Sequence, residues 1–297
     1  MLFIVGSVKI LPASSLLANI KTVLLGFTIY MKSKLQASLW RKMFLFVFIL
    51  VSGCGYFQSQ SDKDKEESKW PEDRLYKMAK EKLDFGSCGG AIEYYEKLQA
   101  RYPFGVYTQQ SQIELAYCYY RTDDPMMAII TIDRFIKLYP THVNMAYAFY
   151  IRGLINFGRG KGLAERWLPK DGSQRDPGMS LESFNDFSEV VKTFPESVYV
   201  EDARLRMRYL RNQLAQHEVN VSNYYMRRGA YVASANRARY VIEKYQQTPA
   251  VPEALALLAK SYKILELDEL ANDALSVLEL NYPEHPRLSE IKEVIVE

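Results

Sequence analysis

Apolar residues recur along most of the chain at the three- and four-residue spacing that gives a helix one buried face. Four of the stretches end at an aromatic residue followed by proline, which stops a helix, and Tyr245-Gln246 takes the corresponding place in a fifth. The pattern predicts an all-α chain. The ten predicted helices cover residues 71–84, 90–101, 106–121, 125–139, 143–158, 179–194, 198–228, 230–245, 252–266 and 268–281.

The residues that end every second helix recur along the sequence. They stand at Tyr102, Tyr139, Phe194, Tyr245 and Tyr282, at intervals of 37, 55, 51 and 37 residues. Eleven positions before each stands a small residue: Ala91, Ala128, Ser183, Ser234 and Ala271. On the preceding helix, 23 positions before, small residues recur again: Ala79, Ala116, Ser222 and Ala259. Small residues on both helices of a pair allow close antiparallel packing.

This arrangement resembles the tetratricopeptide repeat, a helix–turn–helix unit of ~34 residues. The predicted fold is therefore a superhelical solenoid of about five such repeats. The repeats are degenerate, because large residues stand where a second small residue is usual: Leu98, Phe135, Val190, Val241 and Leu278. The two long intervals come from a loop inserted between Gly158 and Gly178 and from a long helix over 198–228, ended by Gly229.

The N-terminus has the features of an export signal. Residues 1–53 contain six basic residues and no acidic one, and the apolar run 43–51 is too short to span a bilayer. The run ends in Val51-Ser52-Gly53-Cys54, which resembles a bacterial lipobox. We expect Cys54 to carry S-diacylglycerol and N-palmitoyl groups, giving a stable lipid anchor. The alternative is an ordinary signal peptide that happens to meet a cysteine.

These features divide the chain. Residues 1–53 are the predicted signal, with Met31 as a possible true start, and 54–70 are a lipidated N-terminus with a flexible tether. Residues 71–177 form repeats 1–3 with the inserted loop, 178–283 the C-terminal repeats, and 284–297 a tail. Gly55 after the cysteine is the pattern that, in enteric lipoproteins, accompanies export to the outer membrane. The predicted location is therefore the outer membrane, with the domain facing the periplasm.

The charge and the motifs exclude several functions. Removing the six basic residues of the signal changes the formal net charge from +3 to −3, which argues against nucleic-acid binding. The three histidines lie far from one another and from cysteines, so no metal site is expected, and no phosphate loop or nucleophile elbow occurs. We expect no enzymatic activity and no cofactor other than the lipid. Cys88 and Cys118 are interpreted as thiols, Cys118 as a buried one, with a disulfide between them as the alternative.

The chain is rich in aromatic residues, with 22 Tyr and 14 Phe. Tyrosine suits the binding of extended peptides, because it offers apolar area and a hydroxyl group at low entropic cost. The repeat register places a set of these side chains on or near the concave face: Tyr76, Lys80, Ile113, Tyr117, Tyr120, Tyr147, Tyr150 and Phe157. Of these, Tyr76, Ile113, Tyr117, Tyr147 and Tyr150 are predicted to bind substrate peptide, and the alternative is that most of the set packs between repeats.

Several strings resemble the BamD family of outer-membrane assembly lipoproteins. They are Arg101-Tyr102-Pro103-Phe104-Gly105, Asp133-Arg134-Phe135-Ile136, Arg152-Gly153-Leu154, Arg175-Asp176-Pro177, Tyr224-Tyr225, Arg228-Gly229-Ala230 and Asn236-Arg237. The resemblance runs from the lipobox to about Pro283, and the inserted loop and the long helix fall where that family has them.

The resemblance implies a lipid-anchored adaptor of the β-barrel assembly machinery. Its implied partners are the periplasmic domains of a BamA-type insertase, accessory Bam lipoproteins and unfolded outer-membrane β-barrel proteins. The N-terminal repeats would bind substrate segments, the C-terminal repeats would dock the insertase, and Arg237 matches the family arginine at that surface.

Two other functions remain open from the sequence. One is a pilotin-like repeat lipoprotein that guides a secretin to the outer membrane, although the loop and the long helix argue against it. The other is a peptidoglycan lyase, which would need a further catalytic domain for which the 14 residues after Pro283 leave no room.

Overall fold

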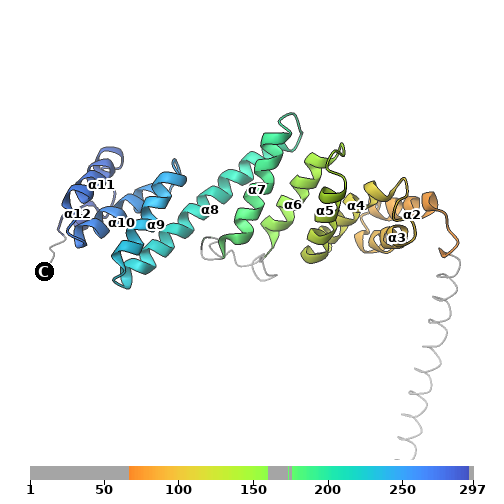
Figure 1. Cartoon of the computed structure of the whole chain (residues 1–297), viewed down its shortest axis with the longest axis horizontal. Coiled ribbons are helices and arrows are strands. Elements are labelled where there is room, and N and C mark those ends of the chain that lie inside the picture. Colours follow the sequence, from red (N-terminus) through yellow and green to blue (C-terminus); the bar gives the residue numbers. More distant parts are fainter. Residues whose placement is uncertain (1–66, 160–172, 174–175, 294–297) are drawn as a thin grey trace, which may run out of the picture. The chain divides into compact units, whose positions relative to one another are not determined.

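The computed structural model describes residues 67–159, 173 and 176–293. The described part is entirely helical, and its helices belong to one compact unit that begins at Pro71. Each helix packs against the next along the chain (Figure 1). The helices are α2 (Glu72–Asp84), α3 (Cys88–Arg101), α4 (Thr108–Arg121), α5 (Pro125–Leu138), α6 (Met145–Gly158), α7 (Pro177–Thr193), α8 (Val200–Arg227), α9 (Tyr231–Lys244), α10 (Val251–Ile264), α11 (Asp268–Asn281) and α12 (Leu288–Lys292).

The ten predicted helices are confirmed, each to within two residues at either end. The predicted signal, lipobox and Cys54 lie outside the described residues, as does most of the inserted loop. The long helix α8 has 28 residues, about 42 Å at ~1.5 Å per residue. It ends where Gly229 takes a φ of +74°, a left-handed conformation that a residue with a side chain rarely adopts.

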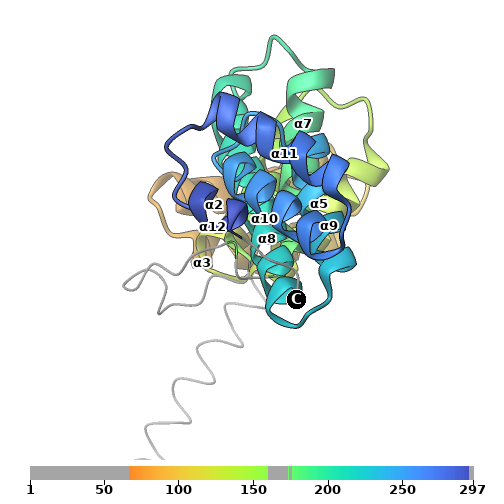
Figure 2. The ribbon, with the colours of Figure 1, turned by 90° about the vertical axis from the view of Figure 1, so that its left-hand side faces the viewer.

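The turn between repeats has the same hydrogen bond in all five places. The carbonyl of the helix-ending aromatic residue accepts from the N–H three positions on, as between Tyr102 and Gly105 at 3.1 Å. The fifth copy, between Tyr282 and His285 at 3.0 Å, leads into α12. This helix was not predicted, and it lies within the predicted tail. It starts a sixth repeat and packs on α10 and α11 with Ile291 buried, at the C-terminal end that faces the viewer in Figure 2.

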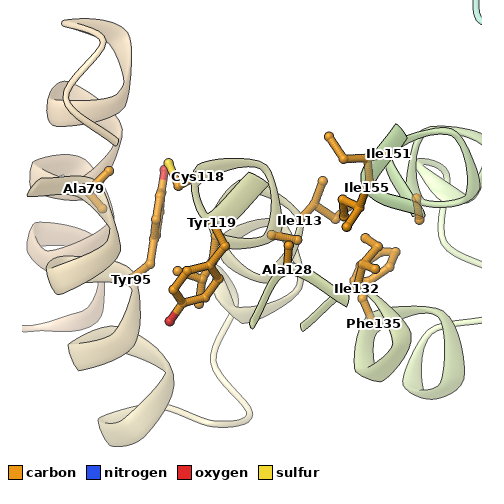
Figure 3. Packing of buried hydrophobic residues seen from close by; sticks show 14 of the residues in the cluster. Ala79, Tyr95, Ile113, Cys118, Tyr119, Ala128, Ile132, Phe135, Ile151 and Ile155 are labelled. Carbon is orange, nitrogen blue, oxygen red and sulfur yellow. The ribbon is translucent and has the colours of Figure 1, made fainter. Parts of the chain in front are cut away.

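The small residues lie where the helices meet. All nine of those that define the register are buried, which confirms that they are the contact points of paired helices. Gly153 also lies at a close contact between helices, because a Cβ placed there would lie 2.7 Å from Cε1 of Phe187 on α7. The large residues of the second helices fill the spaces between repeats, and in Figure 3 the ring of Tyr95 extends toward Cys118. Both Cys88 and Cys118 are free thiols.

Candidate functional site

The predicted peptide-binding residues come from α2, α4 and α6, the first helices of the first three repeats. Tyr76, Tyr117, Tyr147 and Tyr150 are all half-buried, so each leaves part of its ring accessible. Ile113 is the exception, because it is only 2% exposed and belongs to the core between repeats. The prediction that Ile113 contacts a peptide is therefore wrong: the neighbouring repeats close over a position that the helical register alone could not distinguish from an accessible one.

Tyr76 forms the first of two tyrosine stacks. Its ring lies 4.6 Å from that of Tyr107, with 15° between the planes. The backbone N–H of Tyr107 donates to Oε1 of Glu72 at 2.8 Å, which ties the turn before α4 to α2. The stack lines an open cavity of about 710 Å³ together with the exposed ring of Phe85. Burial, and after it the nearby Glu114 carboxylate, raises the pKa of Tyr76 to about 12, so its hydroxyl remains a hydrogen-bond donor at neutral pH.

A buried carboxylate accepts a hydrogen bond from this stack, through the hydroxyl of Tyr76. Glu114 on α4 accepts at Oε1 from Nζ of Lys80 at 3.0 Å, from Nε2 of Gln110 at 3.1 Å and from the hydroxyl of Tyr76 at 3.5 Å. The hydroxyl of Tyr95 on α3 donates to Oε2 at 2.6 Å. Side chains of α2, α3 and α4 therefore all donate to this one carboxylate, and hydrogen bonds to an ionised group are among the strong ones. Glu114 was not predicted as a site residue; its signal was a glutamate within the otherwise uncharged stretch of α4.

Tyr150 forms the second stack. Its ring lies 4.7 Å from that of Tyr199, with 20° between the planes, and Tyr147 packs against Tyr199 at 5.4 Å. The hydroxyl of Tyr150 donates to Oδ2 of Asp202 at 2.8 Å, and Arg206 donates to the same oxygen. Burial acts to raise the pKa of Asp202, but the hydrogen bonds from Arg206 and Tyr150 together lower it. An open cavity of about 470 Å³ is lined by Tyr147 and Tyr199.

Tyr117, on α4 between the two stacks, interacts with a cation. Nη1 of Arg121 donates to its hydroxyl at 3.0 Å, and the guanidinium lies 5.8 Å from the ring centre. Lys80, Tyr120 and Phe157, also predicted near this face, are half-buried as well. The first helices of repeats 1–3 thus carry a series of half-buried aromatic rings, several of which also pack against the buried core, and their role in peptide binding stays a prediction.

A second polar cluster explains two of the motifs noted in the sequence. Arg152 on α6 contacts Oδ1 of Asp186 on α7 at 2.6 Å and Oδ1 of Asp133 on α5 at 2.9 Å. Asn156 donates to the other oxygen of Asp186 at 2.9 Å. Burial raises the pKa of Asp186, and Arg152 and Asn156 oppose that change. The cluster joins three helices, so we assign it a structural role.

Arg237 lies on the surface of α9, where its side chain is 47% exposed. Its Nη1 contacts Oε2 of Glu218 on α8 at 3.0 Å. The neighbouring Arg239 is also exposed and donates to Asn236 within its own helix. An exposed arginine with a single ion pair can exchange that partner for a carboxylate on another protein at little cost.

Two features are absent from the described residues. No helix in this part of the chain combines the length and apolar character needed to cross a membrane. No group of three histidine, cysteine or acidic side chains is arranged there to hold a metal ion.

Comparison with known proteins gives the following relatives. A family model described as YfiO, outer membrane lipoprotein, matches residues 68–278. The outer membrane protein assembly factor BamD of Neisseria meningitidis serogroup B is 42% identical over 221 residues, covering 74% of this chain and 83% of that protein. The protein of the same name from Xylella fastidiosa Temecula1 is 39% identical, covering 82% of both chains. A solved tetratricopeptide-repeat protein of Thermus thermophilus aligns with 75% of this chain and 100% of its own, at 11% identity and a TM-score of 0.34.

Proposed function

We propose a function for this chain from the premise that it belongs to the BamD family of outer-membrane protein assembly factors. As a member, it is a tetratricopeptide-repeat component of the Bam complex. The finer role that we propose is that of a non-catalytic adaptor. It binds the periplasmic domains of a BamA-type insertase and unfolded outer-membrane β-barrel proteins, alongside accessory Bam lipoproteins, and helps the barrels to fold and insert.

The observation that carries this proposal is the series of half-buried tyrosines on α2, α4 and α6. Their rings offer apolar area and their hydroxyls offer hydrogen bonds, which together suit an extended chain with alternating apolar side chains. Binding of this kind favours modest affinity, about 8 kcal/mol at a micromolar Kd, and lets the client leave again.

The insertase is proposed to dock on α8 and α9. This segment carries exposed basic side chains, among them Arg227, Arg228 and Arg237. The long helix α8 packs against both α7 and α9 and therefore connects the client-binding repeats to the docking repeats. A rigid connection would hold the client at high effective concentration near the insertase. Lipid groups on Cys54 would keep the whole assembly at the outer membrane, on its periplasmic side.

The experiment that tests this role is affinity purification of the tagged, lipidated chain from detergent-solubilised outer membranes, followed by mass spectrometry. We expect a large barrel protein with periplasmic repeats to co-purify. Arg237→Glu should abolish that recovery while helicity is unchanged, and Arg239→Glu, on the same helix, should not. Recovery of a secretin in its place would overturn the assignment in favour of a pilotin-like role, and undiminished recovery with Arg237→Glu would overturn the docking site.

A further inference from the structure

The two tyrosine stacks occupy the same position in two different repeats. Tyr76 and Tyr150 each stand three residues before the small residue of their helix, Ala79 in one case and Gly153 in the other. Tyr107 and Tyr199 each stand five residues after the aromatic residue that ends a repeat. The ring geometries are nearly the same, with centres 4.6 and 4.7 Å apart. Equivalent positions in a repeat array face the same side of the array.

The repeat between them lacks a stack. The corresponding residues there are Ile113, which is buried, and Asn144, which donates from Nδ2 to Oε1 of Gln110 at 3.2 Å. The array therefore places a pair of rings at one repeat, none at the next, and a pair at the one after.

Both stacks have the same chemical support. In each, one hydroxyl donates to a carboxylate that also accepts from a cation: Glu114 with Lys80, and Asp202 with Arg206. These bonds fix the rings whose hydroxyls donate them, so each stack is already ordered before anything binds.

Each stack also borders its own cavity. The 710 Å³ cavity is lined by Tyr76, Tyr107 and Phe85, and by acidic and basic side chains in nearly equal number. The 470 Å³ cavity has the aromatic residues Tyr147, Phe194 and Tyr199, with Glu196 as its single charged residue. Both linings present the edges and faces of aromatic rings, which favour another aromatic ring.

The distance between the cavities follows from helix packing. The stacks belong to α2 and α6, the first helices of repeats 1 and 3, with α4 as the first helix of the repeat between them. Taking ~8–10 Å, the spacing of packed helices, for each step from one first helix to the next gives roughly 18 Å between the two sites. An extended chain advances ~3.3 Å per residue, which makes this five to six residues. Two side chains on the same side of an extended chain are separated by an even number of positions, which selects about six.

We infer that the two tyrosine stacks form paired subsites that accept two aromatic side chains, about six residues apart, of one extended client segment. This inference rests on the proposed binding of unfolded barrel proteins. It adds to that proposal which client sequences the site prefers. The aromatic pair would set where along a client the adaptor binds.

The test is a double-mutant cycle with synthetic peptides of about twelve alternating Thr and Ser residues that carry two Phe residues. The separation of the Phe residues is set to two, four, six or eight positions, and binding to the lipidated full chain in detergent is measured by fluorescence anisotropy. We expect the peptide with a separation of six to bind most tightly, and removal of either Phe to weaken it roughly tenfold, as burial of a phenyl ring requires.

Tyr107→Ala and Tyr199→Ala remove the half-buried ring of each stack. Each variant should weaken binding of the peptide that carries both Phe residues. That loss of affinity should disappear when one of the two Phe residues is removed from the peptide, and the Phe concerned should differ between the two variants. Tyr240→Ala, an exposed tyrosine on α9, is the control and should change nothing. Binding without a spacing preference, or coupling of both variants to the same Phe, would overturn the paired subsites while leaving the adaptor role intact. No saturable binding by any peptide would overturn both proposals.

Discussion

Removing the hydroxyl of Tyr95 is expected to destabilise the N-terminal repeats. Tyr95 is fully buried on α3, and its hydroxyl lies 2.6 Å from Oε2 of Glu114, inside the protein. The other three donors to this carboxylate all bind Oε1. Tyr95→Phe therefore keeps the ring in place and leaves Oε2 without its donor.

The magnitude follows from the type of bond that is lost. A hydrogen bond to a charged group contributes about 1.5–3 kcal/mol, because the charge cannot recover the same interaction from water once it is buried. We expect Tyr95→Phe to lower the free energy of unfolding by about 2–3 kcal/mol. Tyr119→Phe is the matched control, since Tyr119 is also a buried ring but its hydroxyl donates to the exposed Glu96. Water can replace that donor, so the loss there should be about 0–1 kcal/mol.

The assay is urea unfolding followed by far-UV circular dichroism, with hydrogen exchange to localise the effect to α3 and α4. Tyr95→Phe should lower the midpoint without changing the slope, and it should cost less when Glu114→Gln is already present. Equal losses for the two tyrosines would refute the argument, because solvent access to the carboxylate would then make no difference.

Three further predictions concern packing, thiol reactivity and pH. Gly153→Ala should destabilise by up to about 2 kcal/mol in thermal unfolding, because the contact with Phe187 outweighs the helix propensity of alanine, whereas Gly158→Ala, with open space around it, should be neutral or stabilising. Burial raises the pKa of Cys118, so iodoacetamide should modify it only in the unfolded protein, as mass spectrometry of tryptic peptides would show. The pKa of Asp202 is lowered in the fold, so its contribution is present above the ordinary pKa of about 4 and is lost as the pH falls through the folded value; Asp202→Asn should flatten that part of the stability curve.

The helices and their pairing were predictable because the information is local. The 3.6-residue periodicity and the stop residues determine where a helix lies, and a small residue at a fixed distance from each stop determines where two helices touch. The short helix α12 escaped prediction because five residues are too few to show a period.

The candidate site was only partly predictable, since accessibility and ion pairing depend on neighbours in other repeats. Ile113 and Tyr117 both lie on α4, yet the adjoining repeats bury the first and leave the second half-exposed. Glu114 takes its donors from positions up to 38 residues away, and no local pattern shows which of the chain's lysines and tyrosines will reach it. Tyr107 and Tyr199 could have been predicted from the sequence, because each stands five residues after the aromatic residue that ends a repeat.

The central claim is that the two halves of the chain have different partners: clients bind the N-terminal repeats and the insertase binds the C-terminal ones. A photo-crosslinking benzoylphenylalanine placed at Tyr107 or at Arg237 in the full chain, in living cells, tests this most directly. We predict crosslinks from position 107 to unfolded barrel proteins and from position 237 to the insertase. Crosslinks to the insertase from position 107, with barrel precursors captured only at position 237, would contradict the claim.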